Sequence, residues 1–403
     1  MGRALFPLDE ELGLLAGRYT PRLQEAMARL GSKLPFREAV DELAFGYHTA
    51  ISEPTCRRVT HRSGRAAEAI CCREVERLEK EAPAPVVSPN NLLVSADGSY
   101  IRLTDGNWLE VKSVAAGEFE RAEQSVKTTA ISYFTRSYEI RDFERYALGE
   151  LHQRGLEKAH TVVAVNDGAR WIQSFIDYHC PQAVRIIDFA HALGYVSDAG
   201  KAIWSEGSDA FKAWFPRMAH QLKHKPPQHT VAELRLLQAK AKSDEQAAAL
   251  DRAIFYLQTR LEMIDYPFFQ KRGYPIGSGC VESGHKVVVQ RRLKGAGMRW
   301  APHHVDPMLA LRDLVCNRRW SEGWSQIVTY QQKQRSLKRM AAVFTEEKPI
   351  SEPITFAKLK KAGLLPAEKK PVKTSGGKST RRPAADHPWR NNVWPTKESW
   401  RWN

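Results

Sequence analysis

The sequence lacks any long apolar run. No stretch of its 403 residues approaches the roughly 18 to 20 uninterrupted apolar residues of a membrane span, and the opening MGRALFPLDEELG lacks the apolar block of a secretory signal. We therefore expect a cytoplasmic protein with no membrane partner. A hydrophobic content of 42% is sufficient for a sizeable core and for two or three domains.

Cysteines at metal-binding spacing are also absent. The six cysteines are Cys56, Cys71, Cys72, Cys180, Cys280 and Cys316. They include no C-x-x-C pair, and none has a histidine at zinc-finger spacing. We expect reduced, mostly buried thiols rather than structural zinc.

Acidic residues are outnumbered. The chain has 61 Lys and Arg against 46 Asp and Glu, a formal net charge of +15. This excess favours a polyanionic partner, because Lys and Arg that neutralise phosphates release counterions. The last stretch, from Lys358 onward, has twelve basic residues against three acids. We predict that residues 346–403 form a basic, largely disordered tail, which either grips nucleic acid or folds back on the protein.

Residues 1–82 are predicted to be helical and to include a helix-turn-helix. Pro35 opens one helix, Gly46 turns the chain, and Ser52 caps the next helix. On that second helix the residues expected to face a DNA groove are Arg57, Arg58, His61 and Arg62. A solvated basic helix in a plain helical bundle fits the same pattern.

A proline-rich hinge, residues 82–89, precedes a different pattern. Residues 91–119 contain short β-rich runs, interrupted by Asp97-Gly98 and Asp105-Gly106, dipeptides that favour tight reversals. They predict a three-strand meander with Asp97 at the end of its first strand.

Strands and helices then alternate. The predicted order is a helix at about 141–158, a strand at 160–168, a helix at 169–179, a strand at 183–189 and a helix at 190–204. Such alternation predicts a mixed α/β sheet covered on both faces. In this reading, residues 83–205 form the first part of the core, 206–272 an all-α insertion, and 273–345 the completion of the core, with a helix that carries Glu282.

Three acids stand where a sheet can present them: Asp97, Asp167 at the end of the strand 160–168, and Glu282 near the start of its helix. They can converge, because α/β sheets open a crevice at the carboxyl ends of their strands. Converging carboxylates need a cation, and their hard oxygens suit Mg²⁺ or Mn²⁺. A pair of such ions promotes in-line phosphoryl displacement. Each acid taken alone is more often structural.

Basic residues follow Glu282. His285 and Lys286 lie three and four positions on, which predicts a shared helical face continued by Gln290 and Leu293. The residues expected to contact DNA phosphates here are His285, Lys286, Arg291, Arg292 and Lys294. An ordinary ion pair between Glu282 and Lys286 is the alternative.

Several segments together resemble a known family. They are Asp97-Gly98, NDGARWI from Asn166, IIDFAHA from Ile186, and GSGCVESGHKVVVQRRLKGAGMRW ending at Trp300. They are similar to bacterial insertion-sequence transposases of the ISKra type, within the Mutator-like DDE transposases. The resemblance extends from FPLDEELGL (residues 6–14) through MLALRDL to PAADHPWR near the end.

The resemblance implies an RNase H-like catalytic core with a helical insertion before its last acid. Asp97, Asp167 and Glu282 would be the catalytic residues and would hold two Mg²⁺ (or Mn²⁺) ions. Asp188 and His191 match a pair that follows the second catalytic acid in relatives, and would position the scissile strand or brace the site. Asp188 is also a rival for the second metal ligand.

The implied function is transposition. The protein would bind terminal inverted repeats, cut DNA by metal-assisted hydrolysis and join the freed 3′ hydroxyls to target DNA. Its partner would be double-stranded DNA, in a homodimer or larger synaptic assembly associated with the nucleoid. Two alternatives remain open: a catalytically inactive DNA-binding protein derived from a transposase, and an RNase H-like nuclease without strand transfer.

Overall fold

A computed structural model of the chain describes residues 15, 19–122 and 125–344, the last seven without their side chains. Up to Ala341 these residues belong to one compact unit. The predicted basic tail and the segments FPLDEELGL and PAADHPWR lie outside the described residues.

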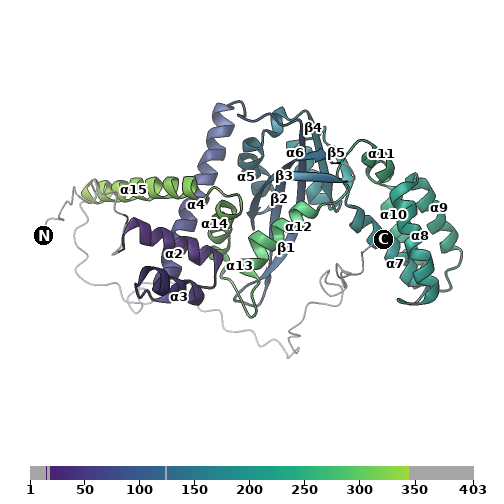
Figure 1. Ribbon diagram of the computed structural model, residues 1–403, viewed down its shortest axis with the longest axis horizontal. Helices are drawn as coiled ribbons and strands as arrows, with labels where there is room; N and C mark the ends of the chain where they lie inside the picture. The colour runs from purple at the N-terminus through teal and green to yellow at the C-terminus, as the bar shows by residue number, and fades with distance from the viewer. Residues whose placement is uncertain (1–14, 16–18, 123–124, 345–403) are drawn as a thin grey trace, which may run out of the picture. The chain divides into compact units, whose positions relative to one another are not determined.

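Five strands form one mixed sheet in the order β3-β2-β1-β4-β5 (Figure 1). β1 (Asn91–Arg102), β2 (Trp108–Arg121) and β3 (Val126–Arg136) form an antiparallel meander. β4 (Thr161–Asn166) is parallel to β1, and β5 (Val184–Ile187) is parallel to β4. The predicted α/β class with a mixed sheet is confirmed.

The prediction for the meander was partly wrong. Asp97 and Gly98 lie inside β1, which pairs with β2 without a break from Leu92 to Arg102. The Asp97-Gly98 dipeptide favours a turn, but it forms none here because the backbone hydrogen bonds along the whole of β1 outweigh that local preference. Asp105-Gly106 does form the turn, with Gly106 at φ 92°. The third strand, β3, lies beyond the segment that the sequence pattern assigned to the meander.

Helices cover both faces of the sheet. α5 (Ile140–Gln153) and α6 (Arg170–His179) pack on the face that carries Leu92, Val94 and Ala96. On the other face, α7 (Phe189–Ile203) packs near Leu93. On the same face, α12 (Gly279–Gly284) and α14 (Val305–Cys316) pack near Ile101. Asp97 shares the alternation of Leu93 and Ile101 and thus faces α12.

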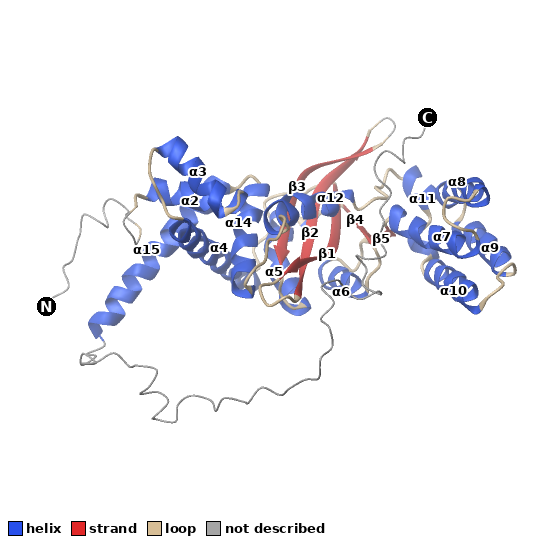
Figure 2. Ribbon diagram, turned by 90° about the horizontal axis from the view of Figure 1, so that it is seen from below, coloured by secondary structure: helices blue, strands red, loops and turns tan. Residues whose placement is uncertain are grey.

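Between β5 and α12 the regular elements described are all helical. They are α7, α8 (Asp209–His224), α9 (Pro227–Gln238), α10 (Asp244–Gln258), the 3₁₀ turn η2 (Leu261–Met263) and α11 (Tyr266–Lys271). Figure 2 shows α7 to α10 packed side by side. Their shared core includes Leu222, Leu234 and Leu257, all fully buried. None of the helices described is long and apolar enough to cross a membrane.

The amino-terminal helices pack around one long helix. They are α2 (Pro21–Lys33), α3 (Phe36–Tyr47) and α4 (Glu53–Glu81). α4 approaches α14 closely, because a Cβ at Gly64 would lie 2.2 Å from the Pro307 carbonyl oxygen. Gly31 of α2 similarly makes room for Thr60 of α4. One side of α4 is thus buried in the hydrophobic core. After α14, α15 (Trp320–Phe344) ends the described chain.

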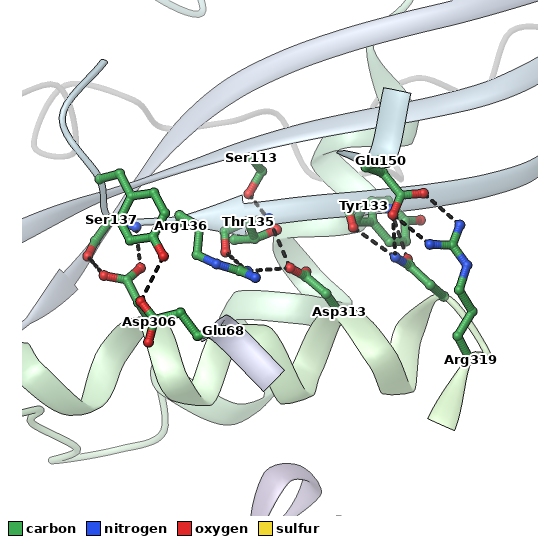
Figure 3. A network of polar contacts seen from close by, with 12 residues as sticks. Glu68, Ser113, Tyr133, Thr135, Arg136, Ser137, Glu150, Asp306, Asp313 and Arg319 are labelled. Carbon is green, nitrogen blue, oxygen red and sulfur yellow. Dashed lines mark hydrogen bonds and ion pairs between the residues drawn. The ribbon is translucent and has the colours of Figure 1, made fainter. Parts of the chain in front are cut away.

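Side chains of α14 line the free edge of β3 (Figure 3). The pairs are Asp306 with the Ser137 amide at 2.6 Å, Asp313 with the Thr135 amide at 3.1 Å, and Asn317 with the Tyr133 amide at 2.8 Å. The intervals of seven and four residues put the three side chains on one helical face. α14 therefore satisfies edge amides that a sixth strand would otherwise bond.

Asp313 also forms a buried ion pair. Its Oδ2 lies 2.6 Å from Nη1 of Arg136, whose side chain is 3% exposed. Burial raises the pKa of Asp313 to about 7, against the opposing effect of Arg136. Nearby, Arg319 binds both carboxylate oxygens of Glu150 at 2.7 Å. The first contact holds α14 against the sheet, and the second holds the residue that precedes α15 against α5.

All six cysteines lie in the described part and are free thiols. Cys56 and Cys180 are buried and the other four are partly buried, so the predicted burial holds fully for only two of the six thiols.

Candidate functional site

Asp97 and Asp167 lie on adjacent strands. The parallel register of β1 and β4 pairs Leu92 with Val162 and Val94 with Ala164. Asp167 directly follows β4, and the same offset places it opposite Asp97. One residue earlier, the side-chain oxygen of buried Asn166 accepts a hydrogen bond from the Ala96 amide at 2.6 Å. Asn166 therefore fixes the two strands to each other just before the acids.

The turn after β4 holds Asp167 in place. Gly168 adopts φ 82°, a left-handed conformation that favours glycine. The carboxylate of Asp167 accepts the Ala169 amide at 2.8 Å, and its carbonyl accepts the Tyr256 hydroxyl at 2.6 Å. Tyr256 belongs to α10, so the helical segment between β5 and α12 reaches directly to this acid.

Asp188 links the end of β5 to the start of α12. Its carboxylate accepts the His191 amide at 2.8 Å, capping α7, and also the Ser278 amide at 2.7 Å and hydroxyl at 3.0 Å. The residue is 5% exposed. These three donors commit both oxygens of Asp188, so its geometry is that of a brace for the Glu282 helix rather than an open ligand. The His191 ring packs near Tyr195 and Tyr256.

Glu282 sits on α12, which lies against the sheet. A Cβ at Gly284 would come within 2.7 Å of the Tyr133 ring on β3, so only glycine permits this approach. Ser278 fixes the start of the same helix through Asp188. Gly284 and Ser278 therefore hold α12, which carries Glu282, against the face that carries Asp97.

The charges of these acids influence one another. Burial raises the pKa of the half-buried Glu282, and the negative charges of Asp188 and Asp97 raise it further. Burial likewise raises the pKa of Asp167, with Asp97 and Asp188 again adding to the effect. Four carboxylates thus share one electrostatic environment.

Two basic side chains lie beside Asp97. His285 is buried, with its Nδ1 3.2 Å from Oδ2 of Asp97, and its Nε2 has no hydrogen-bond partner. Lys294 donates from Nζ to the Ser99 hydroxyl at 2.6 Å. Burial lowers the pKa of Lys294 to about 8, while Asp97 opposes that shift. Asp97 therefore faces positive or polarisable partners as well as the other acids.

The donor set suits a hard cation, but its atoms are not gathered into one coordination sphere. Over the described ranges, no three His, Cys, Asp or Glu side chains stand close enough to hold a metal ion. Asp97, Asp167 and Glu282 offer carboxylate oxygens, the ligands that Mg²⁺ and Mn²⁺ prefer. Metal binding would require Asp97 to exchange its contact with His285 for the cation.

The predicted shared face after Glu282 is only partly realised: the charges of His285 and Lys286 both act on Glu282, but Gln290 and Leu293 do not continue one face. Residues His285–Gln290 form a π-helix, η3, and a turn of α-helix, α13 (Arg291–Leu293), follows. The wider turns shift the side chains, so His285 and Leu293 are buried while Lys286 and Gln290 are exposed. Among the expected phosphate contacts only Lys286 and Arg291 lie on the exposed surface, and Lys294 is partly buried.

Arg292 cannot contact DNA in this structure. It is 2% exposed, and its Nε donates to the Gly31 carbonyl at 2.9 Å. Its guanidinium lies over the rings of Phe36 and Trp300. Arg292 thus joins α13 to α2, which sequence spacing could not indicate.

The four residues of α4 that were predicted to face a DNA groove differ in their exposure. Arg57 and Arg58 are exposed. His61 is 4% exposed, and Arg62 is half-buried with a hydrogen bond to the Gln24 side chain. Arg62 therefore turns towards α2, and His61 is buried below the exposed arginines.

Sequence reasoning did not single out Asn166, Tyr256 or Ser278. Asn166 and Ser278 stand next to predicted functional residues, so their positions carried a signal. Tyr256 lies 89 residues beyond Asp167, and no local pattern links the two.

Comparison with known proteins gives one distant relative. The chain is 25% identical over 327 residues to a Streptococcus gallolyticus protein described as "UPF0236 protein in vanSb 3'region". The match covers 77% of this chain and 66% of that protein, slightly less than two thirds of its length. No family model matches the sequence.

Proposed function

We propose that the protein is a DDE transposase with an RNase H-like core, which cuts DNA at the ends of an element and joins them to target DNA. The observation that carries the proposal is the arrangement of three acids. Asp97 lies on the central strand β1, Asp167 follows the adjacent parallel strand β4, and Glu282 lies on a helix packed over the same face. A helical segment separates the last acid from the others, as the resemblance implies.

Asp97, Asp167 and Glu282 would hold Mg²⁺ or Mn²⁺, most simply as a pair of ions. When bound, such ions supply charge neutralisation for phosphate oxygens and acidify a water or a 3′ hydroxyl. Burial is the main cause of the raised pKa values of Asp167 and Glu282, and repulsion from neighbouring carboxylates adds to it. A cation would relieve that repulsion, which fits this role. The same carboxylates can serve both hydrolysis and strand transfer, which differ only in the attacking hydroxyl.

Other residues of the chain would position this cluster. Asn166 aligns β1 with β4, and Asp188 anchors the start of α12. Exposed Lys286 and Arg291, on the helical run that follows Glu282, are placed to contact backbone phosphates of the bound strand. These roles favour precise holding of the strand beside the acids.

The test is cleavage of labelled duplexes that carry the ends of the element encoding the chain, in Mg²⁺ or Mn²⁺. The isosteric variants Asp97→Asn, Asp167→Asn and Glu282→Gln remove one charge each and keep the side-chain shape. We expect each of them to abolish cleavage and strand transfer. Asp188→Asn should instead reduce cleavage by about 10- to 100-fold, as expected for a residue that orients ligands.

Asp209→Asn is the matched control, because Asp209 is fully exposed on α8. It should cleave like the wild type, and circular dichroism should show that every variant is folded. Full activity in Asp97→Asn or Glu282→Gln would refute the site. DNA binding without cleavage by the wild type would favour the inactive DNA-binding protein, and cleavage without joining would favour the nuclease.

A further inference from the structure

A pocket on α4 combines arginines with the buried imidazole of His61 and the partly buried imidazole of His304. It has a volume of about 240 Å³ and is lined by Pro54, Arg57, Arg58, His61, Arg65 and His304. Arg57, His61 and Arg65 follow each other at intervals of four, so they form one stripe along α4. His304 comes from the 3₁₀ turn η4 (Pro302–His304), which precedes α14. The pocket is distinct from the acidic cluster.

The arginines of this pocket lack acidic partners. In the described parts of the chain, no ion pair involves Arg57, Arg58 or Arg65. All three are exposed, and Arg58 makes a neutral hydrogen bond to the Thr55 hydroxyl at 3.2 Å. Glu53, one turn before Arg57, does not pair with it. Three like charges held together in this way favour an anion between them.

Two residues that line the pocket carry unused polar atoms. His61 is 4% exposed and stacks on His304 with ring centroids 3.8 Å apart. The Nδ1 atoms of both rings are buried without a hydrogen-bond partner. A buried polar atom without a partner is costly, and a ligand that accepts a hydrogen bond would remove that cost. A neutral imidazole has one N–H to donate.

The electrostatic surroundings are positive. Burial, with smaller contributions from His304 and Arg65, lowers the pKa of His61 to about 3. Burial also lowers the pKa of His304, with contributions from His303 and Arg65. Every charge that shifts these imidazoles is positive. The rings thus stay neutral donors at neutral pH, beneath three guanidinium groups.

We propose that this pocket binds a phosphate group of the DNA backbone, with Arg57, Arg58 and Arg65 around it and the two imidazoles beneath it. Guanidinium forks match the oxygens of a phosphate. The pocket therefore fixes the position of the duplex without reading bases. The pocket itself stands on its own geometry, whereas the choice of duplex DNA as phosphate donor rests on the function proposed above.

The test measures binding of a short labelled duplex of random sequence to the full chain in EDTA, so that no strand is cut, over a range of salt concentrations. The variant is Arg57→Gln/Arg58→Gln/Arg65→Gln. The control, Arg141→Gln/Lys240→Gln/Lys242→Gln, removes three exposed charges elsewhere. Losing three phosphate contacts should make the slope of log affinity against log salt shallower by about 2.7, at about 0.9 per contact. The control should change the slope by much less.

Equal slopes for the two triple variants, both folded, would overturn the proposal. So would a pocket variant that loses binding to phosphatidylglycerol vesicles but keeps the wild-type slope on DNA, because the phosphate donor would then be a lipid. The outcome is separable from the catalytic proposal. If the pocket variant has a shallower slope but the wild type does not cleave DNA, the pocket proposal is supported and the transposase proposal is refuted. If the wild type cleaves DNA but the slope of the pocket variant is unchanged, only the pocket proposal is refuted.

Discussion

His179, the last residue of α6, is a partly buried imidazole away from the acidic cluster. Its Nε2 lies 2.8 Å from the Glu144 carbonyl oxygen, and its ring packs on Phe175. Burial lowers its pKa to about 4, from an ordinary value of 6.5. The folded protein therefore keeps His179 neutral at pH values at which the unfolded chain has already bound a proton.

This shift predicts a loss of stability as the pH falls. Below pH 6.5 the unfolded chain takes up a proton at His179 that the folded protein takes up only near pH 4. The contribution of His179 to the free energy of unfolding should thus fall by about 2 kcal/mol between neutral pH and pH 5. His179→Gln keeps a side-chain donor but cannot titrate. Urea unfolding at several pH values should show a free-energy difference between wild type and variant that changes by this amount, and parallel curves would contradict it.

At the scale of one element, α14 protects the edge of the sheet. Asn317 matters most for this, because it both accepts from the Tyr133 amide and donates to the Tyr133 carbonyl, each at 2.8 Å. It thereby imitates the pairing of a neighbouring strand. The side-chain amide of Asn317 also donates to the Glu150 carboxylate at 3.4 Å.

Asn317→Ala should therefore destabilise the fold. It leaves both backbone groups of Tyr133 unpaired, and each buried unpaired group costs about 1–3 kcal/mol. Urea unfolding should show a midpoint well below that of the wild type. Gln228→Ala, at an exposed position of α9, is the matched control and should change little. A stability loss no larger than that of the control would mean that water or a shifted side chain satisfies the edge.

At the scale of the whole molecule, the fold class followed from local patterns. The β4 run has a continuous apolar sequence, and alternating strands and helices gave the mixed sheet covered on both faces. Local turn propensity failed at Asp97-Gly98, because the hydrogen bonds of a long strand pair outweigh it. Periodicity failed after Glu282, because a π-helix breaks the spacing of 3.6 on which that reasoning depends.

The site was predictable where its residues flank strands and unpredictable where distant contacts decide burial. Asp167 follows a clear strand, and the register of β1 and β4 brings it beside Asp97. Arg292 looked like one of several surface bases, yet its partner Gly31 lies 261 residues away. No pattern within one helix could show that the guanidinium of Arg292 is buried. The burial of the His61 ring could not be predicted for the same reason.

The proposed catalytic site requires Asp97, Asp167 and Glu282 to share divalent ions. Calorimetric titration of the full chain with Mn²⁺, in the presence of duplex DNA, tests it most directly when Asp97→Asn, Asp167→Asn, Glu282→Gln and the control Asp209→Asn are compared. We predict saturable binding to the wild type and to Asp209→Asn, and loss of most of that binding in each of the other three variants. Undiminished Mn²⁺ binding by these three folded variants would contradict the account.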